Sequence, residues 1–168
     1  YLSKVKAIAD ATLKADLANM KFTFEESNLQ LNEVKAGIDG WLAMVSETGM
    51  DFDLKLNAPA TQFKDILSLL PSIYTDDFKE IKTSGSASLD AYIKGLMDGE
   101  IYPSFNVALV ITDAILQYPS LPKSVNNINV DIKVKSKGGS LDNTVVDISK
   151  FNFTMAGNPF SASLNIRT

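Results

Sequence analysis

Asp51 and Asp53 stand two residues apart and could in principle serve as paired carboxylates for acid–base chemistry or as a small metal site. They alternate with Phe52 and Leu54, so both are expected on one solvated face of a β-strand, beside Lys55. Carboxylates beside a lysine on the wet face of a sheet need no catalytic explanation. We therefore interpret them as surface charges.

The remaining acidic pairs also have simpler explanations. Asp76 and Asp77 are placed to favour the positive end of a short helix, and Asp98 and Glu100 flank a glycine in a turn. A calcium loop would need more oxygen ligands at loop spacing than this turn offers. We expect neither a metal nor another cofactor.

Hydroxyl groups are concentrated in the segment TSGSAS, residues 83–88. The chain has no histidine to act as a base and no cysteine to act as a nucleophile, and it contains no G-x-S-x-G elbow. A Ser–Lys pair stays open, but small hydroxyls on an exposed strand explain the segment more simply. The glycines of KGGS lack the spacing of a phosphate-binding loop, and the sequon Asn152–Thr154 falls inside a predicted strand. The sequence thus favours a protein that is not an enzyme.

The amino-acid composition limits the kinds of partner that this chain can bind. The chain has 168 residues, 45% of them hydrophobic, and a formal net charge of -4, which suits one globular domain and gives no basic footprint for nucleic acid. No apolar run is long enough to span a bilayer. Because the chain opens directly in strand register without an initiator Met, we expect it to be a fragment of a longer protein.

Period-two alternation runs through most of the sequence and predicts half-buried strands. In the clearest example, Ile128, Val130, Ile132 and Val134 alternate with polar residues. The same pattern covers residues 5–17, 22–31, 34–40, 50–56, 84–91, 105–111, 125–134, 146–155 and 160–166. The apolar positions change from odd to even between Leu31 and Val34, and this change requires a bulge or a turn.

One segment has helical spacing instead. Phe63, Ile66 and Leu67 predict a helix that begins at Thr61 as N-cap and ends at Pro71, and residues 75–81 predict a second short helix. A helix this short is expected to pack inward onto the core. We accordingly divide the single domain, 1–168, into a first β unit (1–58), a helical insert (60–80) and a second β unit (81–168). The two units could be related, because the apolar positions of residues 29–40 can be aligned with those of 146–157.

Three stretches together resemble a known family. They are FKDILSLLPSIYTDDFKEIKTSGSASLDAYIKG (63–95), ILQYPSLPKSVNNINVDIKV (115–134) and TVVDISKFNFTMAGNPFSASLNI (144–166). Their order along the chain and their pattern of residue types resemble the C-terminal part of AsmA-like proteins of the Gram-negative cell envelope, particularly those of Bacteroidetes. The resemblance covers about residues 63–166, and residues before 50 fit only through alternation.

The resemblance implies a function and a location. AsmA-like proteins are typically anchored in the inner membrane by one N-terminal helix, and their periplasmic β-sheet is thought to carry phospholipid toward the outer membrane in outer-membrane biogenesis. It therefore implies a non-enzymatic envelope module in the periplasm. The implied partners are phospholipid acyl chains, other repeats of the same chain and envelope proteins. No catalytic residue is implied.

The expected fold is mainly β with a short helical insert: a curved antiparallel sheet that forms a half-pipe or an open sandwich. Its apolar face has too few residues available to cover it, so part of that face should form a groove. The residues expected to face the groove are Val107, Leu109, Ile111, Val130, Ile132, Val134, Phe151, Phe153 and Met155. The alternative is a closed scaffold domain that binds protein partners and no lipid.

Overall fold

The computed structural model describes residues 6–69, 81–118 and 123–168. Its strands are β1 (Ala7–Asp16), β2 (Lys21–Leu31), β3 (Val34–Met44), β4 (Met50–Gln62), β5 (Lys82–Met97), β6 (Ser104–Gln117), β7 (Val125–Ser136), β8 (Thr144–Met155) and β9 (Asn158–Arg167). A short helix, α1 (Phe63–Leu67), follows β4, and a 3-10 turn (Leu141–Asn143) precedes β8. The predicted end of the first helix at Pro71 and the predicted second helix lie outside the described residues.

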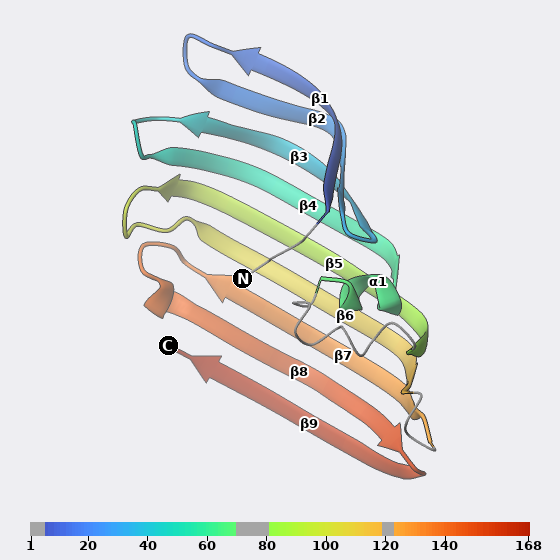
Figure 1. The fold of residues 1–168 in the computed structure, drawn as a ribbon. Helices are drawn as coiled ribbons and strands as arrows, with labels where there is room; N and C mark the ends of the chain where they lie inside the picture. The colour runs from blue at the N-terminus through green and yellow to red at the C-terminus, as the bar shows by residue number, and fades with distance from the viewer. Residues whose placement is uncertain (1–5, 70–80, 119–122) are drawn as a thin grey trace.

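The described strands form one antiparallel sheet in which each strand pairs with its neighbours in sequence, from β1 at one edge to β9 at the other. The sheet is open and curved, and α1 lies on one of its faces (Figure 1). This confirms the expected mainly β fold with a short helical insert. Because β4 pairs directly with β5, the strands before and after the helical segment belong to the same sheet.

The register brings the apolar positions of neighbouring strands opposite one another. One row across the sheet consists of Leu89, Leu109, Ile132, Ile148 and Leu164, each paired with the next. The row beside it consists of Leu56, Ala91, Val107, Val134, Val146 and Ile166. Since directly opposite residues point to the same side of a pleated sheet, these rows make one face of the sheet continuously apolar.

Bulges keep the apolar side chains of each strand on this face. The register shifts by one residue between Phe24 and Ser27 in β2, and comparable shifts occur in β4, β6, β7 and β8. Asp113 and Asn127, at the shifts in β6 and β7, have φ of 48° and 53°. A bulge bends its strand and increases the local twist. Several bulges within one sheet therefore account for its curvature.

The phase change between Leu31 and Val34 is a two-residue hairpin turn at Asn32 and Glu33. Asn32 has φ of 52°, and its side-chain oxygen accepts a hydrogen bond of 2.8 Å from the Lys6 backbone N–H. The expected turn or bulge is thus a turn.

The proposed alignment of residues 29–40 with 146–157 is wrong. The first segment crosses the hairpin between β2 and β3, whereas the matching phase break in the second is a bulge between Ile148 and Phe151 inside the single strand β8. A turn reverses the chain and a bulge does not. The two segments therefore have different structures despite their similar patterns.

Helix α1 begins one residue later than expected. Its N-cap is Gln62, and Thr61 is the last-but-one residue of β4. Asp65 stabilises the junction between β4 and α1. One of its carboxylate oxygens accepts hydrogen bonds from the Gln62 backbone N–H at 3.2 Å and from the Thr61 hydroxyl at 3.3 Å. The predicted inward packing of the helix is confirmed, because Phe63 belongs to the largest buried cluster.

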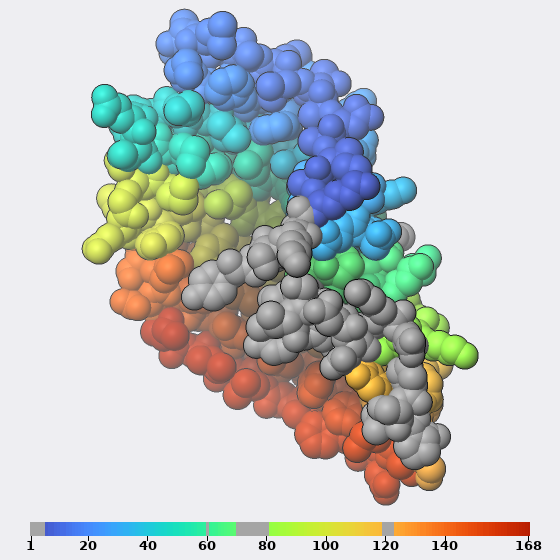
Figure 2. Space-filling view, in the orientation of Figure 1, coloured from blue at the N-terminus to red at the C-terminus, as the bar shows by residue number. Residues whose placement is uncertain are grey.

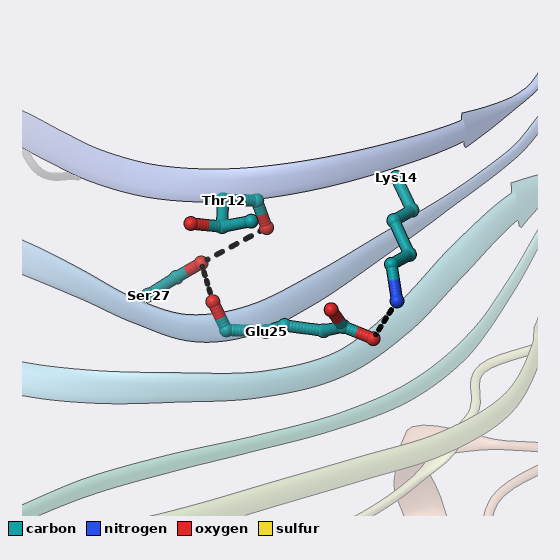
Figure 3. Close-up of polar contacts among 4 residues, drawn as sticks. All are labelled: Thr12, Lys14, Glu25 and Ser27. Carbon is teal, nitrogen blue, oxygen red and sulfur yellow. Dashed lines mark hydrogen bonds and ion pairs between the residues drawn. The ribbon is translucent and has the colours of Figure 1, made fainter.

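Ser27 is a buried polar residue at the bulge of β2, only 2% exposed. Its hydroxyl donates a hydrogen bond of 3.1 Å to the carbonyl oxygen of Glu25 and lies 3.5 Å from the carbonyl oxygen of Thr12 in β1 (Figure 3). On the same two strands, Lys14 and Glu25 form an exposed ion pair of 2.7 Å. The Ser27 hydroxyl therefore gives the Glu25 carbonyl at the bulge a side-chain donor.

We expect Ser27→Ala to lower the free energy of unfolding by about 1–2 kcal/mol, because it leaves the part-buried Glu25 carbonyl without this donor. Urea denaturation followed by circular dichroism measures the change. Lys14→Ala is the matched control: it breaks an exposed ion pair on the same strands and should change stability by less than about 0.5 kcal/mol. Equal effects of the two substitutions would contradict this role for Ser27.

Candidate functional site

The middle of the apolar face is covered by α1. Phe63 is 6% exposed and packs with Ile111 and Ala114 of β6 and Ile128 and Val130 of β7. Leu109, Leu116, Val125, Ile132 and Phe153 pack around this cluster as half-buried neighbours. The first turn of the helix therefore seals the sheet over β5, β6 and β7.

A second cluster lies on the other side of α1. Val34 and Ala36 of β3 and Ala58 of β4 are buried, and Ile66 and Leu69 pack against them. The short helix thus divides its apolar side chains between the two halves of the sheet. Ile66 contacts both clusters, so α1 connects them into one core.

The apolar face continues beyond the helix to the β9 edge. Five large side chains there are 39–52% exposed: Phe151, Met155, Phe160, Leu164 and Ile166. We call these five residues the apolar border. Figure 2 looks onto this face, with β8 and β9 in orange-red and red along its lower boundary and β1 and β2 in blue along its upper one. Single exposed hydrophobic residues are ordinary, but a contiguous set on two neighbouring strands is typical of a binding surface.

Three phenylalanines give the apolar border a defined shape. The rings of Phe153 and Phe160 stack at a centroid distance of 4.8 Å, and Phe151 meets both edge-on, at 5.6 Å and 6.4 Å. Phe153 is half-buried because it also packs against the cluster under Phe63. The aromatic group therefore links the sealed centre of the face to its exposed border.

All nine residues predicted to face the groove lie on this apolar face, but they differ in accessibility. Phe151 and Met155 are exposed, and Val107, Leu109, Ile132, Val134 and Phe153 are half-buried. Ile111 and Val130 do not line an open surface, which corrects the expectation for these two. They are 7% and 5% exposed because Phe63 packs directly onto them.

At the β9 edge of this face, three accessible residues were not among those predicted, namely Phe160, Leu164 and Ile166. Their alternation is as regular as that of the other strands, so the sequence carried the signal for their face. It carried no signal that β9 would be an edge strand, and the edge position is what leaves them exposed.

The opposite, polar face carries the charged residues. Asp53 accepts a hydrogen bond of 3.1 Å from the Tyr92 hydroxyl and forms an ion pair of 3.0 Å with Lys94 on β5. The hydrogen bond from Lys94 lowers the pKa of Asp53, and the same contact raises the pKa of Lys94. Asp51 instead accepts a hydrogen bond of 3.0 Å from the backbone N–H of Phe52. The two carboxylates therefore have separate partners.

Of the other acidic pairs considered from the sequence, Asp76 and Asp77 lie outside the described residues. Asp98 accepts a hydrogen bond of 2.8 Å from the Thr48 hydroxyl, which joins two neighbouring turns. Over residues 6–69, 81–118 and 123–168 there is no group of three or more side chains able to hold a metal ion. A shallow hollow on the polar face is lined by Lys133, Lys135 and Arg167 together with Asp147.

Comparison with protein-family models, with curated proteins and with solved structures finds no match to this chain. Within the described part of the chain, no helix has the length and apolar character needed to cross a membrane.

Proposed function

We propose that this chain is a non-enzymatic cell-envelope module whose apolar β-face contacts phospholipid acyl chains during transport toward the outer membrane. On this proposal the parent protein is AsmA-like and periplasmic, is anchored in the inner membrane of a Gram-negative bacterium, and works with other repeats of the same chain and with envelope proteins. The observation that carries the proposal is the apolar face, which is sealed under α1 but continues to an exposed border on β8 and β9.

The direction of the apolar rows suits a long hydrocarbon chain. The row ending in Leu164 crosses five strands without a polar residue, and the row ending in Ile166 crosses six. At about 4.8 Å per strand, the five intervals of the longer row, from β4 to β9, span roughly 24 Å. An acyl chain lying along a row would therefore contact several strands in succession.

The energetics favour acyl chains over polar ligands. Each buried methylene contributes about 0.8 kcal/mol, so a long acyl chain needs no specific polar contact to bind. Its head group can stay in water beyond the sheet. Binding a ligand of this kind requires no polar motif in the sequence. This agrees with a chain that presents apolar rows on one face and solvated charges on the other.

Extraction of the purified 168-residue protein with organic solvent, followed by mass spectrometry, tests the proposal. We expect phospholipid to copurify, and we expect Leu164→Glu or Met155→Glu to reduce lipid per protein by about tenfold or more. Losing contact with two methylenes already removes about 1.6 kcal/mol, which exceeds a factor of ten in affinity.

Thr154→Glu is the matched control, because it introduces the same charge beside Met155 on the polar face of β8. It should leave the lipid content unchanged. If no phospholipid is recovered from the wild type, or if all three variants lose it equally, acyl-chain binding by this face is ruled out.

A scaffold domain that binds protein partners and no lipid is the second candidate, and the sealed centre of the face favours it. Phe63 leaves Ile111 and Val130 without access to any ligand, as in an ordinary closed core. On this alternative the apolar border is a protein contact. The extraction experiment separates the two candidates, since a scaffold should contain no phospholipid while remaining folded.

A further inference from the structure

The free edge of β9 is open to pairing between Pro159 and Arg167. Among the described strands, β9 pairs only with β8. The Thr168 backbone N–H donates to the carbonyl oxygen of Thr144, so this pair is a hydrogen-bonded one. Because such pairs recur every second residue in an antiparallel ladder, the even residues of β9 bond to β8. The backbone N–H and C=O groups of Ser161, Ser163 and Asn165 therefore point away from the sheet.

The middle of this edge lacks the features that usually prevent strands from pairing with other molecules, and Pro159 and Arg167 lie at its two ends. From Phe160 to Ile166 it contains no charged residue and no proline, and its outward-facing backbone belongs to small or uncharged residues. The other edge differs, because β1 carries Asp10, Lys14 and Asp16 along its polar side. Charged side chains on an edge strand are a common protection against edge-to-edge pairing, and the charged residue of β9, Arg167, lies at the end of the strand.

The number of strands determines which edge β9 can meet. Nine antiparallel strands make β1 and β9 run in the same direction, so stacking copies head to tail would give a parallel β9–β1 contact. Two β9 edges related by a two-fold axis perpendicular to the sheet pair antiparallel instead. That axis also keeps both apolar faces on the same side, because rotation about the sheet normal does not turn the sheet over.

We propose that two copies of this chain associate through β9 to form one continuous antiparallel sheet, with Ser163 opposite Ser163 of the partner subunit. In this register Phe160 lies opposite Ile166 of the partner subunit, and Ala162 lies opposite Leu164 of the partner subunit. On the apolar face an aromatic residue meets a β-branched one, and a small residue meets a large one. On the polar face Ser161 meets Asn165 of the partner subunit.

The pairing gives the apolar border neighbours on both sides. In one copy Phe160, Leu164 and Ile166 contact protein only on the β8 side and are 45–51% exposed. In the dimer each gains a cross-strand partner, and the apolar rows run without interruption from one subunit into the other. The edge contact involves one strand from each copy, which is small for a stable interface, so the dimer should depend on concentration in the micromolar range.

Disulfide trapping tests both the dimer and its register, and the absence of cysteine from the chain makes the experiment clean. Opposite residues of a hydrogen-bonded pair have Cα atoms about 5.5 Å apart, within the range of about 4.4–6.8 Å that a disulfide requires. Ser163→Cys should therefore give a cross-linked dimer under mild oxidation. Ser161→Cys should not, because Ser161 and Ser161 of the partner subunit are offset by four residues along the strand, or roughly 13 Å.

A mixture of Ser161→Cys and Asn165→Cys proteins completes the test, because these two positions face each other across the proposed axis. The mixture should cross-link, whereas each protein alone should stay monomeric on a non-reducing gel. Cross-linking of Ser161→Cys as efficient as that of Ser163→Cys, or a wild-type protein that sediments as a monomer at about 100 μM, would overturn the proposal.

Ser163→Pro provides a folded monomer for comparison. Its N–H points away from β8, so proline removes no hydrogen bond within the chain but blocks the edge. We expect the variant to sediment as a monomer with an unchanged circular dichroism spectrum. Its lipid content, measured separately, shows whether acyl-chain binding survives without the dimer, so that the two proposals fail or succeed independently.

Discussion

Replacing Gly40 with alanine is expected to lower the free energy of unfolding by more than about 4 kcal/mol, enough to prevent folding of a domain of ordinary stability. Gly40 has φ of 115° in β3, a conformation that residues with a Cβ rarely adopt. A Cβ placed there would lie 1.9 Å from the carbonyl oxygen of Asp53 in β4. The clash is with backbone, so no side-chain rotation can relieve it.

Gly37 is the control for this prediction because it lies on the same strand. A Cβ at Gly37 would have as its nearest neighbour the carbonyl oxygen of Asn57 at 3.8 Å, an ordinary contact. Gly37→Ala should therefore leave stability within about 1 kcal/mol of the wild type. Urea unfolding of both variants, monitored by circular dichroism, gives the comparison, and a Gly40→Ala protein as stable as Gly37→Ala would contradict the close approach of β3 and β4.

Phe63→Ala is expected to cost about 3–5 kcal/mol, the usual effect of removing a buried aromatic side chain from a core. Phe63 fills the space above Ile111, Ala114, Ile128 and Val130, and truncation leaves a cavity there. The substitution should also make Ile111 and Val130 accessible, so binding of an apolar fluorescent probe should increase under conditions where the variant is still folded.

Phe160→Ala serves as the matched control, since it removes the same side chain from the same face at a position that is 49% exposed. Its stability cost should be less than half that of Phe63→Ala, because much less apolar area returns to water. If thermal denaturation shows equal losses for the two variants, α1 does not seal the centre of the face as described.

These two predictions separate two ways in which the sheet is specified. Gly40 acts through the backbone, because the strands can approach at this bend only without a side chain. Phe63 acts through side-chain packing, because α1 is the described element that covers the apolar rows. The apolar border depends directly on neither the close approach at Gly40 nor the packing of Phe63, so a ligand or a second copy can occupy it without disturbing the core.

Much of the fold followed from local patterns. Period-two alternation identified each strand and its apolar side, since adjacent residues of a strand point to opposite faces whatever the strand pairs with. The change of phase between Leu31 and Val34 required a turn or a bulge, and the spacing of Phe63, Ile66 and Leu67 required a helix. These features depend on neighbouring residues only, and for that reason the sequence alone determined them.

Only the tertiary structure decided which apolar residues stay accessible. Alternation places Val130 and Leu164 on the same kind of face, but it does not specify which strands are neighbours, where the sheet ends or which strands a helix covers. Those properties come from long-range pairing: the register puts Val130 under Phe63 and leaves Leu164 on an edge. The similar patterns of 29–40 and 146–157 make the same point, because a phase change is satisfied equally well by a turn or by a bulge, and only the pairing partners select between them.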